Sequence, residues 1–200
     1  MQYPDLARTL IRLKDADLAL RTQLLREGKL NDGYHPEMAA VHDRNARETD
    51  KIIMQIGYPT TEKVGRKGSL AAWLIIQHAV GQPDLMRKCA ALLTEAVNAG
   101  QADPQSLAYL TDRIAVFESK PQLYGTAFDY DENGALNPLP YDDLILVNQR
   151  RRAVGLLSLE EQTALLRRRA EEEGEKPPAD FAAKQAAYEK WRREVGWLGE

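Results

Sequence analysis

The sequence predicts a mainly α-helical fold, a helical bundle around a central apolar helix at about residues 69–80, with one β-hairpin at about residues 123–139. Apolar residues recur at helical spacing along most of the chain, which is typical of amphipathic helices packed on a shared core. The segment Leu70–Val80 is apolar all round except for Gln77 and His78. A helix of that kind is surrounded by other helices, so we place it at the centre of the bundle.

Proline, glycine and capping residues indicate where the predicted helices begin and end. Gly65 and Gly68 bracket a basic segment that we predict to be a loop, and Ser69 can cap the central helix after it. Ser158 and Glu161 form a capping box for a later helix. The predicted helices span residues 4–27, 36–56, 69–79, 83–100, 104–119 and 143–154, and a further helix follows Ser158.

The hairpin is predicted where the apolar period changes after Pro121. Tyr124, Thr126, Phe128 and Tyr130 alternate with smaller or acidic residues, and an Asn-Gly turn signal follows. Two prolines close off the return strand, so that strand must be short or lie at an edge. Gly125 and Ala127 leave one face of the first strand nearly bare, which suits the close approach of a backbone or a ligand.

The end of the chain predicts a separate docking element. We expect a helical domain with the inserted hairpin over residues 1–174, a charged, proline-containing hinge at 175–178, and a C-terminal docking helix at 179–200. Phe181, Tyr188, Trp191 and Val195 fall on one stripe of that helix. Such a stripe must be covered, either by this chain or by a partner such as a second copy.

Composition excludes several classes of protein. With 27 basic and 30 acidic residues the formal net charge is −3, which is too balanced for a nucleic-acid-binding protein. The single cysteine, Cys89, excludes an internal disulfide and a multi-cysteine zinc site, and we expect it to be inert core. Residues 1–5 lack the layout of a signal peptide, and the longest apolar run is shorter than the roughly 20 residues of a membrane span. We therefore expect a cytoplasmic protein that binds neither nucleic acid nor membrane.

Polar side chains occupy positions that should face the core. His42, Asn45 and Thr49 lie on the apolar face of the predicted 36–56 helix, and Asp112 with Arg113 interrupts the apolar 104–119 helix. An unpaired buried polar group costs about 1–3 kcal/mol, while a whole domain is stable by only about 5–15 kcal/mol. These groups, with Gln77 and His78, must therefore bond to one another, to water or to a ligand. We expect them to converge on one polar pocket, with Gln122, Tyr124 and Thr126 of the hairpin as a further wall.

Five short motifs follow one another along the chain: Val41-His42-x-x-Asn45, Gly57-Tyr58-Pro59-Thr60, Ala72-Trp73-Leu74-Ile75-Ile76-Gln77-His78-Ala79, Leu110-Thr111-Asp112-Arg113 and Lys120-Pro121-Gln122-Leu123-Tyr124-Gly125-Thr126. In this order they resemble a bacterial domain-of-unknown-function family, over about residues 36–160. The resemblance implies a shared pocket, to which we assign Trp73 as well, but no chemistry. Tyr58 stands where the family has tryptophan, and Ala127 stands where it has glutamine, so this chain lacks the side-chain amide that the family has at position 127.

The function that these residues favour is a small enzyme with a histidine acid–base site acting on an anionic small molecule or peptide group. The expected roles are His78 as general base or acid, His42 as second proton carrier, Asn45 and Gln77 as orienting amides, Arg113 as anion clamp, and Asp112 and Tyr124 in support. Trp73, Gln122 and Thr126 complete the predicted binding residues. The sequence identifies no cofactor, since glycine-rich nucleotide motifs and a serine nucleophile motif are missing.

Structural interpretations and other functions stay open. Each histidine can be a core residue bonded to a carbonyl, and Asp112 with Arg113 can be an ion pair that ties a helix to the hairpin. The main alternative function is a non-enzymatic binding or interaction module, regulatory or immunity-like, that forms a homo-oligomer through its C-terminal helix. A third is a metal-dependent hydrolase in which His42, His78 and one carboxylate, such as Asp112, bind iron or manganese. We assign no metal ligands on spacing alone.

Overall fold

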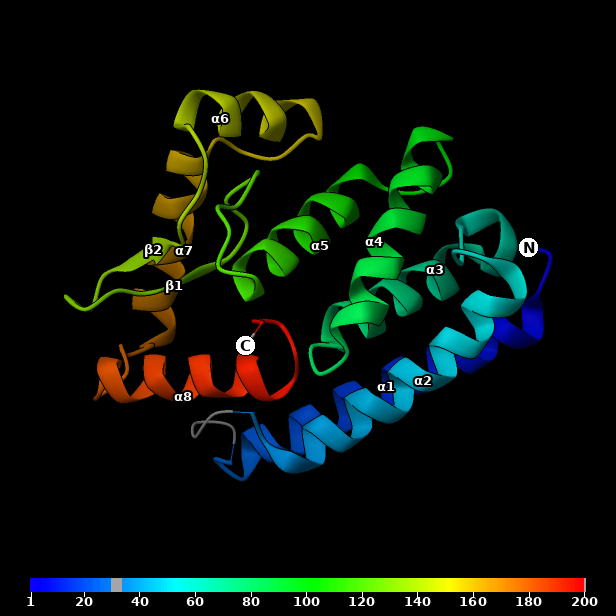
Figure 1. The fold of residues 1–200 in the computed structure, drawn as a ribbon, viewed down its shortest axis with the longest axis horizontal. Helices are drawn as coiled ribbons and strands as arrows, with labels where there is room; N and C mark the ends of the chain where they lie inside the picture. Colours follow the sequence, from blue (N-terminus) through cyan, green and yellow to red (C-terminus); the bar gives the residue numbers. More distant parts are fainter. Residues whose placement is uncertain (30–33, 200) are drawn as a thin grey trace. The chain divides into compact units, whose positions relative to one another are not determined.

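The computed structural model describes residues 1–29 and 34–199, and most of them are helical (Figure 1). The helices are α1 (Pro4–Arg26), α2 (Pro36–Ile56), α3 (Thr61–His78), α4 (Pro83–Asn98), α5 (Pro104–Phe117), α6 (Leu144–Ala153), α7 (Leu159–Glu173) and α8 (Phe181–Glu194). Two short strands, β1 (Phe128–Tyr130) and β2 (Leu136–Pro138), pair antiparallel as a hairpin. The predicted fold class, mainly α with one hairpin, is confirmed. Among the described residues no helix combines the length and the apolar character needed to cross a bilayer.

The chain divides into two compact units, Met1–Asp103 and Pro104–Glu200. This division lies inside the predicted 1–174 domain, so the predicted domain and hinge boundaries stay a prediction. The first unit holds α1 to α4, and the second holds α5 to α8 with the hairpin.

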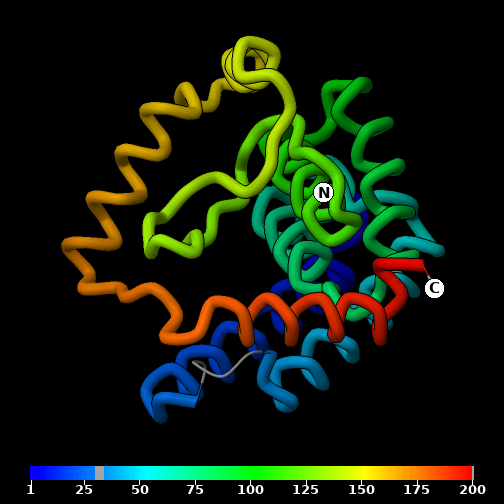
Figure 2. Tube along the Cα trace, turned by 60° about the vertical axis from the view of Figure 1, so that its left-hand side comes forward, coloured from blue at the N-terminus to red at the C-terminus, as the bar shows by residue number. Residues whose placement is uncertain are grey.

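In the first unit α3 is the helix that packs against α1, α2 and α4, as expected for the central helix. The ribbon and the tube views both show α1 and α2 side by side (Figures 1 and 2). The core between α1, α2 and α3 is formed by Ala7, Leu10, Leu13, Ile52, Ile56, Val64, Ala71, Ala72 and Ile75.

The alignment of α1 with α3 is set by two contacts in the N-terminal half of α3. The backbone amides of Gln2 and Tyr3 donate to the carbonyl of Lys63, at 2.9 and 2.8 Å. Five residues further along α3, Gly68 lies so close to α1 that a Cβ there would be 3.2 Å from the Cβ of Ala7. The two helices therefore run in the same direction, and the middle of α1 lies beside the C-terminal end of α3.

The predicted basic loop at residues 65–68 is wrong. Helical structure begins eight residues before Ser69, at Thr61, is broken by a kink at Gly65 (φ 71°, ψ 165°), and continues from Arg66 onward. Buried Val64 and the bonds of Lys63 to the start of α1 hold the added turn in place. Contacts with α1 that the local sequence does not reveal thus stabilise this turn as helix.

In the second unit the hairpin is narrower than predicted. Strand pairing is confined to 128–130 and 136–138, and residues 122–126 form a loop rather than a strand. The hairpin packs on α7, where Arg167 donates to the carbonyl of Leu136 and to Asn137.

The C-terminal helix α8 covers its aromatic stripe within its own unit. Rings of Tyr188 and Trp191 lie 6.3 and 5.7 Å from that of Phe117 at the end of α5, and Trp197 stacks on Phe117 at 4.8 Å. Arg192 donates to the carbonyls of Val116 and Phe117, which end α5. The stripe thus has a partner in this chain, and a homo-oligomer built through α8 stays a prediction.

Candidate functional site

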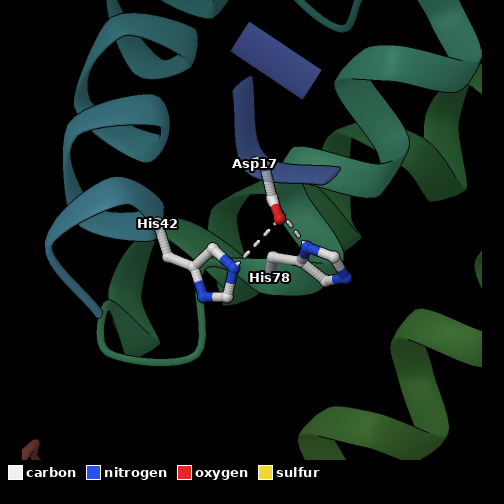
Figure 3. A group of neighbouring side chains, drawn as sticks. All are labelled: Asp17, His42 and His78. Atoms are coloured by element: carbon white, nitrogen blue, oxygen red, sulfur yellow. Dashed lines mark hydrogen bonds and ion pairs between the residues drawn. The ribbon is translucent and has the colours of Figure 1, made fainter. Parts of the chain in front are cut away.

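A buried carboxylate lies between two histidines in the first unit (Figure 3). Asp17 comes from α1, His42 from α2 and His78 from the last position of α3. His78 Nδ1 is 2.7 Å from Asp17 Oδ2, and His42 Nε2 is 3.4 Å from Asp17 Oδ1. The two imidazole rings are 4.9 Å apart, centre to centre. The two histidines that the sequence singles out are therefore brought together, with an aspartate between them.

Helix periodicity explains how each side chain reaches this point. Asp17 occupies the buried stripe of α1 that also carries Leu10, Leu13 and Leu24. His42 lies on the buried face of α2, and the parallel alignment of α1 and α3 brings His78 to the level of Asp17. The side chain of Asp17 is 1% exposed and that of His42 10%, whereas His78 is 24% exposed. Solvent or a ligand thus has its access to the cluster at His78.

The central carboxylate of the cluster is negatively charged. Burial acts to raise the pKa of Asp17, but hydrogen bonds and charge interactions with His42 and His78 outweigh it and hold that pKa well below its usual range. Asp17 is therefore an ionised carboxylate at neutral pH. Tyr34 lies beside it, and burial together with the charges of Asp43 and Asp17 raises the pKa of the Tyr34 phenol. The phenol is therefore neutral.

Two buried atoms of the cluster have only each other as a partner among the described residues. Asp17 Oδ1 and His42 Nε2 face each other in an ion-pair contact of 3.4 Å, and neither makes a further hydrogen bond. The other nitrogen of His42, Nδ1, is engaged by the Tyr34 hydroxyl at 2.7 Å. Leaving a charged oxygen unpaired in a protein interior is costly. The pair therefore requires a proton or a cation between its two atoms.

The same three residues make a set of metal-ligand types. One ligand atom from each of Asp17, His42 and His78 lies within 4.8 Å of the others. Metal bonds of about 2.1 Å in tetrahedral geometry place neighbouring ligand atoms about 3.4 Å apart. The separation of His42 Nε2 from Asp17 Oδ1 matches that value. Two imidazoles and one carboxylate form a donor set that suits zinc, iron or manganese.

The other predicted residues of the first unit lie near the histidines in sequence, but none of the described hydrogen bonds joins them to the cluster. Asn45 Nδ2 donates to the carbonyl of Leu13 at 2.9 Å, which ties α2 to α1 one turn from Asp17. Asn45 Oδ1, Thr49 Oγ1 and Gln77 Nε2 are buried without a described partner. Trp73 is half-buried on α3. Their roles as binding residues stay predictions.

The predicted residues of the second unit form a group of their own around Asp112. Asp112 Oδ1 accepts from the amides of Leu123 and Tyr124, and Oδ2 accepts from the amide and hydroxyl of Thr126, all at 2.8 to 3.0 Å. The buried Gln122 side chain bonds to both backbone groups of Ala127 and to the carbonyl of Leu139. These bonds fix the 122–126 loop on α5, and binding roles for Gln122, Tyr124 and Thr126 stay predictions.

The alternative ion pair of Asp112 with Arg113 is not among the ion pairs of the described residues. The carboxylate of Asp112 is occupied by the loop, and Arg113 is exposed on α5. The tie between helix and hairpin segment expected from that pair is instead made by Asp112 alone. Cys89 is buried as expected, and burial raises the pKa of its thiol to about 12, so it does not supply a thiolate nucleophile.

Sequence reasoning missed two residues of the cluster, Asp17 and Tyr34. Asp17 had a readable signal, because it falls on the leucine stripe of α1 at the spacing of Leu10, Leu13 and Leu24. That is the same argument that singled out Asn45 on α2. Tyr34 had no such signal, since it precedes α2 and reaches His42 from a non-helical segment.

The cluster lies within the stretch that matches a known family. No curated protein and no solved structure matches the chain. A family model does match, over residues 4–172, and this range includes Asp17, both histidines and the Asp112 loop. The chain therefore belongs to DUF6624, a family of unknown function.

Proposed function

We propose that Asp17, His42 and His78 bind one divalent transition-metal ion, and that the protein is a metal-dependent hydrolase. The observation that carries this proposal is the buried contact of Asp17 Oδ1 with His42 Nε2 at 3.4 Å, in which neither atom has a further hydrogen-bond partner among the described residues. A cation between them satisfies both atoms at once, and His78 Nδ1 supplies the third ligand.

The number and charge of the ligands support a catalytic rather than a structural ion. Structural zinc sites use four protein ligands, whereas catalytic sites use three and keep a position open for water or substrate. The cluster offers three ligands, and its partly exposed member, His78, lies on the accessible side. The ionised carboxylate of Asp17 favours a cation at this point.

The chemistry that such a centre supplies is activation of water. A divalent ion lowers the pKa of bound water and polarises a carbonyl or phosphoryl oxygen of the substrate. It also offsets the negative charge of Asp17. This supports the anionic small molecule or peptide group that the sequence favours as substrate.

A second candidate is metal-free acid–base catalysis, the function first favoured by the sequence. The 2.7 Å contact of His78 Nδ1 with Asp17 Oδ2 supports it. With Nδ1–H donating to Asp17, the Nε2 of His78 is left as a base on the more exposed side, and His42 is the second proton carrier.

Metal titration separates the two candidates. Chelator-treated protein is titrated with Zn²⁺ in a calorimeter and with Co²⁺ by visible absorption, which reports coordination geometry. The metal proposal expects one ion per chain, and loss of binding in Asp17→Asn, His42→Gln and His78→Gln. The matched control is His35→Gln, which alters the remaining histidine of the chain, at the N-cap of α2, and should bind as the wild type does.

Circular dichroism establishes that each variant is folded before its affinity is compared. Failure of the wild type to bind either ion, or equal binding by all four variants, contradicts the metal proposal. In that case the acid–base candidate takes its place.

A further inference from the structure

We propose that Tyr34 is a positioning residue of this metal site, whose hydroxyl accepts the Nδ1–H of His42 and thereby directs Nε2 of that ring toward the ion. The inference rests on the proposed function, because it assigns a role within the same centre. It concerns a residue that touches a ligand of the ion rather than the ion itself.

The contact between the two side chains is close and well oriented. The Tyr34 hydroxyl is 2.7 Å from His42 Nδ1, and the rings stack with centres 5.7 Å apart at an interplanar angle of 25°. The phenol therefore holds both the position and the plane of the imidazole. His42 Nε2 is the ring nitrogen without a further hydrogen bond, and it is the one that faces Asp17.

The contact at Nδ1 matters because it determines which nitrogen of His42 can bind a metal. A neutral imidazole carries one N–H, and its other nitrogen is the one that can bind a metal. The hydrogen bond at one nitrogen therefore decides which nitrogen is free. Metal-ligating histidines characteristically donate their second nitrogen to an outer partner, which fixes the ring and its tautomer. At His42 that outer partner is Tyr34.

A phenol suits this position better than a charged group would. A phenol is ordinarily uncharged at neutral pH, so the hydroxyl adds no further negative charge to the site. A neutral hydroxyl can accept a proton or donate one. It can accept from Nδ1–H when Nε2 binds an ion, and donate to Nδ1 when Nε2 is protonated and faces Asp17.

The test removes only the hydroxyl. Tyr34→Phe keeps the stacked ring, and we expect it to weaken Zn²⁺ binding roughly 10–100-fold, the usual loss on removing an outer partner of a metal-ligating histidine. Tyr58→Phe is the matched control, because Tyr58 is a buried tyrosine of the same unit outside the cluster. It should leave Zn²⁺ affinity unchanged.

A spectroscopic measurement on the zinc-loaded wild type does not depend on the folding of any variant. Nuclear magnetic resonance should show a slowly exchanging Nδ1–H on His42 with a nuclear Overhauser effect to the Tyr34 ring. In Tyr34→Phe that proton should exchange quickly, a change that a purely structural role of the ring would not produce.

The outcomes separate the two proposals. If Tyr34→Phe binds as tightly as wild type while Asp17→Asn has lost binding, the role of Tyr34 is overturned and the metal site stands. Absence of the Nδ1–H contact in the loaded wild type also overturns the role of Tyr34. If the wild type binds no ion, the proposed function and this inference fall together.

Discussion

Asp17 and Asp112 are both fully buried carboxylates, one in each unit, and they differ in how their oxygens are satisfied. Asp112 accepts four hydrogen bonds, two on each oxygen, all from one loop. Asp17 has one short bond, with His78, and its other oxygen has only the longer contact of 3.4 Å with His42. A saturated carboxylate has no acceptor capacity left for a ligand, whereas an unsaturated one retains it. The comparison thus supports a structural role for Asp112 and the binding role that we propose for Asp17.

The loop held by Asp112 is also fixed from its other side. Buried Arg151 of α6 donates to the carbonyls of Tyr124 and Gly125 and to that of Leu157. Buried Asp112 therefore accepts from amides of the loop, and buried Arg151 donates to its carbonyls. Such complete pairing is what makes a buried polar network stabilising.

The largest expected effect is that of Asp112→Ala. This substitution leaves three loop amides and the Thr126 hydroxyl without their acceptor, so we expect a loss of about 3–5 kcal/mol in the free energy of unfolding. Urea unfolding measures the loss, and hydrogen exchange at Leu123, Tyr124 and Thr126 localises it. A loss below about 1 kcal/mol would contradict the structural role of Asp112.

Metal loading should produce the next largest effect, at Asp17. With free Zn²⁺ at 100 times its dissociation constant, binding stabilises the folded state by about 2.7 kcal/mol. Thermal unfolding with and without Zn²⁺ should show this gain in wild type and in His35→Gln, and not in Asp17→Asn. An equal gain in Asp17→Asn would mean that the ion binds elsewhere.

A substitution at Gly125 tests how tightly the Asp112 loop is packed. Gly125 has φ +63°, and a Cβ there would lie 2.8 Å from Leu159 Cδ1. We expect Gly125→Ala to cost about 2 kcal/mol, from backbone strain and the displaced leucine. Gly174→Ala is the control, because its φ of +66° carries the strain alone with no atom within 4 Å. Urea unfolding should show a larger loss in the free energy of unfolding for Gly125→Ala than for Gly174→Ala. Equal losses would mean that the loop shifts to make room for the added methyl group.

The smallest expected effect is that of Asp17→Ala in chelator-treated protein. It removes the hydrogen bond with His78 and the longer contact with His42, and the partly exposed His78 can turn its nitrogen to water, so we expect a loss of about 1 kcal/mol. The measurement is urea unfolding beside Asp112→Ala. A loss as large as that of Asp112→Ala would make both carboxylates structural and reverse the comparison.

The sequence by itself determined the secondary structure and most of the polar residues that face inward. Helix ends at Pro36, Pro83 and Pro104, the Asn-Gly hairpin turn, and the buried positions of His42 and Asn45 follow from local spacing. Local spacing also indicates that Asp17 lies on the leucine stripe of α1, although our prediction did not include that residue. These features are readable because a helix repeats over a few residues and its periodicity needs no knowledge of the partner.

The tertiary structure alone decided which polar groups meet and which are saturated. Asp17 and His78 are 61 residues apart, and they touch because α1 and α3 run in parallel, held at Lys63 and Gly68. The same packing turned the predicted loop at 65–68 into helix. Asp112 was expected to bind a ligand or pair with Arg113, but the loop at 122–126 takes up its four acceptor positions. A hydrogen-bond partner is set by three-dimensional proximity, which composition and periodicity do not contain.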